Sequence, residues 1–194
     1  RLAVAEQPDR VVVWDLKARS AVCRIAGPLA EGVNAVALTA DGKRLLTGSS
    51  ELAARLWDAD DGRLIHTLAD KSDKQWPTTV ALSPDGRWAA FAHGTGSGRL
   101  GDPAIDLFDT ATGKLAFRLE GQQRMIGKLS FGPDSTRLAS AGYDDLVRVW
   151  DVTTGQEVLS RPAPRGVIDL GFSRDGRRLC AVAVDGTLRT WVGD

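Results

Sequence analysis

The sequence predicts an all-β chain in which one structural unit recurs about five times. Two marks share a period, and a third observation argues against helices. The first mark is a short strand with an aromatic residue near its end, and these aromatic residues are 43, 51, 42 and 41 residues apart. The second mark is a tight turn that keeps the same period. No segment shows the apolar periodicity of an amphipathic helix, so the repeated unit is expected to consist of strands.

The first mark closes the third strand of each predicted unit. The aromatic residue and its successor are Trp14 and Asp15, Trp57 and Asp58, Phe108 and Asp109, Trp150 and Asp151, and Trp191 and Val192. In three copies a Gly follows the Asp four residues later, at 58–62, 109–113 and 151–155. An Asp carboxylate at this position can accept hydrogen bonds from turn N–H groups, so these Asp residues are predicted to be structural.

The second mark joins the first and second strands of a unit. Its copies are "TADG" at 39–42, "SPDG" at 83–86, "GPDS" at 132–135 and "SRDG" at 173–176. Pro presets a turn dihedral, Asp bonds nearby backbone, and Gly adopts the positive φ that closes the hairpin. Each unit therefore reads as four short strands, as in residues 125–160.

Over the whole chain, these residues closely resemble the WD-repeat β-propeller family. The resemblance implies four-stranded antiparallel blades whose first strands line a channel, whose fourth strands form the rim, and whose marker aromatic residues fill the wedge between blades. The predicted units are approximately 1–30, 31–70, 71–120, 121–162 and 163–194. Because the first and last units contain only three strands each, the chain is expected to form an open arc of a larger ring, of about seven blades at the family's common size.

The chain departs from the family in its polar network of His, Ser or Thr, Asp and Trp. No unit keeps the Gly-His pair, and the nearest match is Gly121 with Gln122. Counting back six and ten residues from each marker predicts the Asp and Ser positions, and in the third unit this count reaches Gly98 within an insertion. Only the fourth unit retains Asp, Ser and Trp together, as Asp144, Ser140 and Trp150, while the other units keep fewer members, such as Asp185 in the fifth. The network is therefore expected to be incomplete in every unit.

Arginine recurs two residues before the marker Trp, as Arg55, Arg148 and Arg189. Strand alternation places each Arg on the same face as its Trp, so the guanidinium is expected to lie along the indole.

Composition argues against several partners. The chain carries 25 basic and 25 acidic residues, so its overall field would attract neither nucleic acid nor a membrane surface. Cys23 and Cys180 lack the spacing of a disulfide framework or metal site. No apolar run approaches the roughly 20 residues of a spanning helix, and no signal peptide is visible. The chain begins at Arg1, so the compartment stays open, with the cytoplasm favoured.

No motif predicts catalysis, a cofactor or a metal. Residues 96–101 satisfy the glycine pattern of a dinucleotide loop, but a strand and not a helix follows them. His66 and His93 lie in successive units without a neighbouring nucleophile, and His66 is expected at the rim. We therefore predict no catalytic, cofactor-binding or metal-binding residues.

The favoured function is a non-catalytic scaffold for protein–protein interactions. Because Arg far exceeds Lys, as in a GC-rich bacterial gene, the expected context is a larger bacterial signalling or regulatory protein. The alternative is a small-ligand or catalytic site in the channel, although the first strands offer a single acid, Asp169. A purely structural segment of a larger sensor is a third hypothesis.

The candidate partner-binding surface is the top face, where loops from strand two to three and from strand four to the next unit emerge together. Interface-prone side chains occur in these loops: Trp76, Arg124, Met125, Tyr143 and Arg165. A protein or peptide is expected to dock there. A competing interpretation of Trp76 is that it only seals a long connection.

Overall fold

The structure is a computed structural model that describes residues 1–6, 10–26, 32–49, 53–69, 76–94 and 103–193. This part of the chain contains strands and turns and no helix, as predicted. It therefore also holds no helix long and apolar enough to cross a membrane.

The strands form five antiparallel sheets, each a meander of consecutive strands. The first sheet contains β1 (Leu2–Glu6), β2 (Arg10–Asp15) and β3 (Ser20–Ala26). The second contains β4 (Val33–Leu38), β5 (Arg44–Ser49), β6 (Ala53–Asp58) and β7 (Leu64–Ala69). The third contains β8 (Trp76–Leu82), β9 (Trp88–Gly94), β10 (Ala104–Asp109) and β11 (Lys114–Glu120). The fourth contains β12 (Ile126–Phe131), β13 (Arg137–Gly142), β14 (Leu146–Asp151) and β15 (Gln156–Pro162). The fifth contains β16 (Val167–Phe172), β17 (Arg178–Ala183) and β18 (Leu188–Val192).

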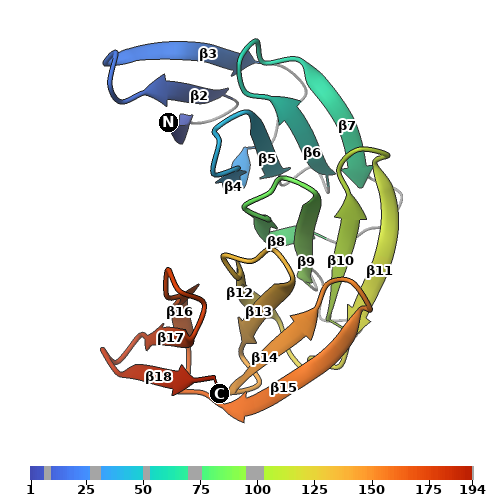
Figure 1. Cartoon of the computed structure of the whole chain (residues 1–194), viewed down its shortest axis with the longest axis vertical. Helices are drawn as coiled ribbons and strands as arrows, with labels where there is room; N and C mark the ends of the chain where they lie inside the picture. The colour runs from blue at the N-terminus through green and yellow to red at the C-terminus, as the bar shows by residue number, and fades with distance from the viewer. Residues whose placement is uncertain (7–9, 27–31, 50–52, 70–75, 95–102, 194) are drawn as a thin grey trace.

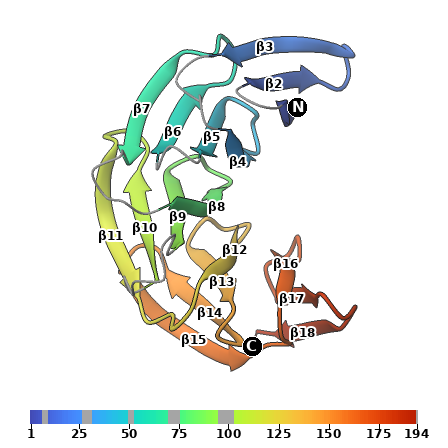
Figure 2. The ribbon, with the colours of Figure 1, turned by 180° about the vertical axis from the view of Figure 1, so that it is seen from behind.

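The sheets are arranged side by side as blades along an open arc (Figures 1 and 2). Strands β4, β8, β12 and β16 lie on the concave side, and β3, β7, β11 and β15 form the rim. Each concave strand contacts its counterpart in the next sheet. The arc of four-stranded blades with three-stranded ends is the fold predicted from the repeat.

The hydrophobic core is divided into four clusters, and each lies between two successive sheets. Trp57, Phe108, Trp150 and Trp191 each pack in the cluster that joins their own sheet to the preceding one. Trp150 is the most deeply buried of them, at 2% exposure, and it packs against Ile105, Leu107 and Leu119 of the third sheet. The recurring aromatic residue is therefore the wedge between blades.

Both predicted turns form as expected. Asp15, Asp58, Asp109 and Asp151 each accept hydrogen bonds from N–H groups of the following turn, as at Asp151, where the N–H of Thr153 lies 2.7 Å from Oδ1. In the hairpin turns Gly42, Gly86 and Gly176 have φ near 70°, and Ser135 replaces Gly with φ 61°. Ser135 Oγ also accepts the N–H of Asp85 in the neighbouring sheet at 3.1 Å. This contact gives the serine a role between blades that glycine could not have.

Two irregularities recur that the sequence pattern did not predict. A register shift occurs at the marker aromatic residue where the third strand pairs with the rim strand, at Trp14, Trp57, Phe108 and Trp150. A second shift occurs in the concave strands, for example between Ile126 and Lys128. Bulges of this kind increase local twist. The second, third and fourth sheets, which have all four strands, therefore carry both bulges at the same two positions.

The fifth sheet ends in an open edge. Within the described part of the chain, β18 pairs only with β17, and Leu188 and Val192 are 65% and 72% exposed. A rim strand covers the corresponding edge of the other four sheets.

Candidate partner-binding site

A buried polar network supports the loops at one end of the fourth sheet. Ser140 Oγ, on β13, accepts the indole N–H of Trp150 at 2.9 Å and the side-chain amide of Gln122 at 2.6 Å. Gln122 lies in the connection between β11 and β12 and is 4% exposed. The network therefore ties this connection to the wedge Trp.

Arg148 links the amide of Gln122 to Asp144. Its NH1 donates to Gln122 Oε1 at 3.0 Å and to Asp144 Oδ2 at 2.7 Å. A carbonyl and a carboxylate are both acceptors, so they can approach each other only with a donor between them. Arg148 provides that donor, and Glu157 of β15 neutralises its other side at 3.2 Å.

The expected incompleteness of the polar network needs correction in the fourth sheet. Gln122 closes the connection to Ser140 and Trp150 that the family makes with His. The sequence did contain the signal, because Gln122 follows Gly121 at the Gly-His position, but the need for Arg148 as a bridge could not be inferred from spacing.

The other sheets keep less of the network. In the second sheet the Trp57 indole N–H bonds Thr47 Oγ1 at 2.9 Å. In the third sheet the strand register places Phe91, not Gly98, opposite Asp106, as Ser140 is opposite Arg148. Phe91 stacks on the marker Phe108 with ring centroids 5.4 Å apart. An apolar stack therefore replaces the hydrogen bond, and the count of ten residues fails because of the insertion.

The expected stacking of Arg on Trp is confirmed for Arg189, whose guanidinium carbon lies 5.6 Å from the ring centroid of Trp191. It is wrong for Arg148, which turns to Asp144 and Glu157 instead.

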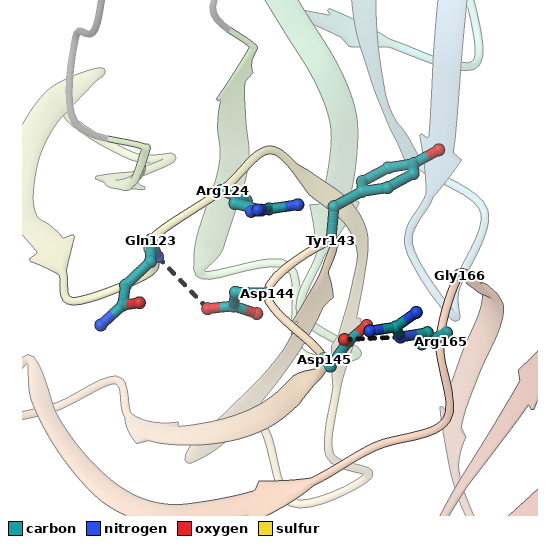
Figure 3. A pocket seen from close by; sticks show the side chains of 7 residues that line it. All are labelled: Gln123, Arg124, Tyr143, Asp144, Asp145, Arg165 and Gly166. Carbon is teal, nitrogen blue, oxygen red and sulfur yellow. Dashed lines mark hydrogen bonds and ion pairs between the residues drawn. The ribbon is translucent and has the colours of Figure 1, made fainter.

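A pocket of about 490 Å³ lies directly outside this network (Figure 3). Its walls come from the β11–β12 connection, the β13–β14 turn and the β15–β16 connection. The lining residues are Gln123, Arg124, Tyr143, Asp144, Asp145, Arg165 and Gly166. The pocket thus spans the fourth and fifth sheets at the end where both kinds of connection emerge.

Equivalent parts of two repeats build the pocket. The N–H of Tyr143 bonds the carbonyl of Met125 at 3.0 Å, and the N–H of Val184 bonds the carbonyl of Gly166 at the same distance. Arg124 and Arg165 directly precede these two carbonyl positions, and they are 41 residues apart, the spacing between Trp150 and Trp191. The repeat therefore places two arginines at one pocket.

The two carboxylates of the pocket differ in their exposure and in the arginine with which each one pairs. Asp144 has a side chain only 3% exposed, and it faces Arg148 and accepts the backbone N–H of Gln123 at 3.2 Å. Asp145 is 43% exposed and pairs with Arg165 at 3.3 Å, while the Arg165 side chain is 91% exposed. Figure 3 shows this pair on one side of the pocket and the Arg124 side chain pointing toward Tyr143. Arg124 has no charged or hydrogen-bonding partner within the described ranges, so the pocket retains a free cation.

Three predicted binding residues meet in this pocket: Arg124, Tyr143 and Arg165. Met125 lies beside it and is 38% exposed, but it does not line it. Trp76 begins β8, and its side chain lies outside the described residues. The pocket also contains Gln123, Asp145 and Gly166, which the sequence did not predict as binding residues. Alignment of the fourth and fifth repeats could have found Asp145, because it stands at the turn position that Gly186 occupies in the fifth repeat. Both residues have positive φ, 59° for Asp145 and 82° for Gly186.

The described residues contain no group of three or more potential metal ligands. His66 lies on the rim strand β7, where its ring rests on the turn at Gly113 of the next sheet and Nε2 is 3.4 Å from the Ala111 carbonyl. This is the rim position expected of it. His93 begins the region whose side chains are not described, and residues 96–101 also lie outside the described residues.

Repeated sheets, wedge aromatic residues and Asp-capped turns define this chain as a β-propeller repeat protein. A family model described as "WD domain, G-beta repeat" matches residues 21–58, 113–151 and 155–191, together more than half of the chain. The chain belongs to the WD-repeat family. Each match begins at or beside a rim strand and ends with the third strand of the next sheet, so the sequence repeat is offset from the structural blade.

Named relatives agree with this assignment. The chain is 31% identical over 95% of its length to the U3 small nucleolar RNA-associated protein 15 homolog of Xenopus tropicalis, covering 34% of that protein. It is 27% identical over 98% of its length to periodic tryptophan protein 2 of Arabidopsis thaliana, covering 20% of that protein. It is 30% identical over 74% of its length to WD repeat-containing protein 1 of Rattus norvegicus, covering 23% of that protein.

The chain thus spans about a third or less of the length of these relatives. All three are eukaryotic proteins and do not support the bacterial context expected from the excess of arginine.

Proposed function

We propose that this chain is a non-catalytic interaction scaffold that binds a protein or peptide in the pocket between its fourth and fifth sheets. The supporting observation is the pocket itself, where Arg124, Tyr143 and Arg165 converge beside the buried polar network of the fourth sheet. Arg and Tyr are enriched at the centres of protein interfaces. Tyr143 is 54% exposed although its backbone is fixed by the bond to Met125, so the ring is presented at little cost in backbone entropy.

The construction of the pocket favours binding over chemistry. Its carboxylates are held by arginines, no histidine or cysteine lines it, and its remaining groups are amide, phenol and guanidinium. General acid–base or nucleophilic catalysis requires several reactive groups that converge on the reacting atoms, and among the described lining residues both carboxylates are already paired with arginines.

One relative is named for its association with small nucleolar RNA. In this chain positive and negative charges balance, so the overall field of the molecule does not attract a phosphate backbone. A protein partner therefore remains our proposal, and added RNA should not compete with it.

The test is affinity capture with the protein as bait, followed by titration of the captured partner against pocket variants. Tyr143→Ala should weaken binding by about 1 kcal/mol or more while leaving the thermal melt nearly unchanged, since the side chain is half exposed. Arg174→Ala, on the turn at the opposite end of the fifth sheet, is the matched control. Equal affinity of the wild type and the Tyr143 variant, or equal losses for both variants, would place the interface elsewhere.

A further inference from the structure

Two exposed arginines share this pocket, although like charges normally separate. Arg124 and Arg165 stand at equivalent repeat positions, so the fold brings them to neighbouring loops whatever their charge. Such a pair is favourable only where anions balance it. The described lining provides two carboxylates, and one of them is not available to the pocket.

Asp144 is directed inward. Its Oδ2 lies 2.7 Å from Arg148 NH1, its Oδ1 accepts the N–H of Leu146 at 3.3 Å, and its side chain is 3% exposed. Because Arg148 is also buried, at 5% side-chain exposure, the charge of Asp144 is used to balance it. Asp144 therefore contributes little negative charge to the pocket.

Asp145 is the remaining carboxylate, and the turn does not require it. The turn needs a residue with positive φ, and the equivalent turn of the fifth sheet meets this need with Gly186. The Asp145 carboxylate instead pairs with Arg165 at 3.3 Å on one side of the pocket. A pair this exposed is weak and exchanges readily with other anions.

We propose that the pocket binds an Asp or Glu side chain of a partner peptide between Arg124 and Arg165, and that Asp145 occupies Arg165 until this carboxylate displaces it. The inference rests on the proposed function of this pocket and adds the chemistry of the ligand. Arg124, free within the described residues, makes first contact, and the exchange at Arg165 completes a two-arginine clamp around one carboxylate. Asp145 thus acts as a built-in competitor that lowers affinity for acidic peptides.

The experiment uses two fluorescein-labelled peptides, one of alternating Glu and Gly and its Gln isostere, followed by fluorescence polarisation at low salt. Wild-type protein should bind the Glu peptide more tightly than the Gln peptide. Asp145→Gly removes the competing carboxylate and keeps the positive φ, as Gly186 does in the next sheet. It should strengthen binding of the Glu peptide about two- to five-fold, the range that an exposed ion pair contributes, and leave the Gln peptide unchanged.

Arg124→Gln and Arg165→Gln should each remove most of the preference for Glu over Gln. Arg174→Gln, at the opposite end of the fifth sheet, should retain it, and raised salt should reduce it in the wild type. Thermal melts of all variants should be close to that of the wild type because the three pocket side chains are exposed or half-exposed.

Equal affinity for both peptides, no detectable binding of either, or no gain in the Asp145 variant would overturn the inference. The proposed function is tested separately by the captured partner. If that partner still depends on Tyr143 while the Glu peptide does not depend on Asp145, the pocket is an interface and only the acidic ligand is wrong.

Discussion

The buried pair of Asp144 and Arg148 should be energetically coupled by about 2 kcal/mol. Both side chains are nearly inaccessible, at 3% and 5% exposure, and their atoms approach to 2.7 Å. Removing one partner of a buried pair typically costs about 3–5 kcal/mol, because the other charge is left uncompensated. Here Arg148 would keep Glu157 at 3.2 Å, with a side chain 36% exposed. We therefore expect Asp144→Asn to cost less, about 2–3 kcal/mol.

The second variant isolates the ionic part of this cost. Arg148→Met leaves the Asp144 carboxylate buried without its counterion, so Asp144→Asn in that background removes an uncompensated charge and should cost little or no free energy of unfolding. The difference between the two backgrounds is the coupling energy. Urea denaturation followed by far-UV circular dichroism at neutral pH measures it with four proteins: the wild type, both single variants and the double variant.

The matched control is Asp185→Asn, at the equivalent turn of the fifth sheet. Asp185 is exposed and accepts the N–H of Thr187 at 2.8 Å, and the arginine at the equivalent position, Arg189, lies over Trp191. This change should cost clearly less than Asp144→Asn. Additive effects of Asp144→Asn and Arg148→Met, within about 0.5 kcal/mol, would refute the assignment of Asp144 as the counterion of a buried guanidinium.

Three further outcomes are expected. Trp150→Ala should lower the free energy of unfolding, measured by urea denaturation, by about 3–5 kcal/mol. Trp191→Ala should lower it less because Trp191 is only partly buried, and equal losses would contradict the wedge assignment. The open β18 edge should make residues 1–194 associate, and Val192→Lys should reduce this in size-exclusion chromatography with light scattering; a compact wild-type monomer with a cooperative melt would argue against it. The side-chain and backbone hydrogen bonds from Thr153 lower the pKa of Asp151 below its ordinary value of 3.8. The ionised Asp151 carboxylate therefore contributes its full stability above pH 3.8, and this contribution is lost as the pH falls through the lowered pKa. Thermal melts across this acid range should therefore decline less steeply for Asp151→Asn than for the wild type.

Much of the fold could be predicted because its determinants are local. The Asp of each "SPDG"-like turn and the Gly or Ser that follows it act within four residues, and strand alternation acts on neighbouring positions. The wedge role of Trp150 followed from the resemblance to the WD-repeat family, whose marker aromatic residues pack between blades, and the structure confirms it. The count to Gly98 failed because an insertion breaks the period, and only strand pairing identified Phe91 at that position.

The site could be predicted only in part. Arg124, Tyr143 and Arg165 were found from their residue types and their loops, and the structure brings them together. Asp145 was missed because a turn residue with a short polar side chain looks like ordinary turn chemistry. Its pairing with Arg165, 20 residues away, depends on how two sheets face each other.

The sequence by itself determined the repeat, the strand order, the turns and the wedge, because each depends on residues that interact within a unit or recur at its period. Tertiary structure alone decided which charged side chains pair in the interior and which remain exposed at the surface. Arg148 was expected along Trp150 and instead bridges Gln122 and Asp144, which leaves Asp145 to Arg165 and Arg124 free within the described residues. The physical reason is that a buried guanidinium must find acceptors, and the packing of the loops, not spacing along the chain, determines which acceptors lie within reach.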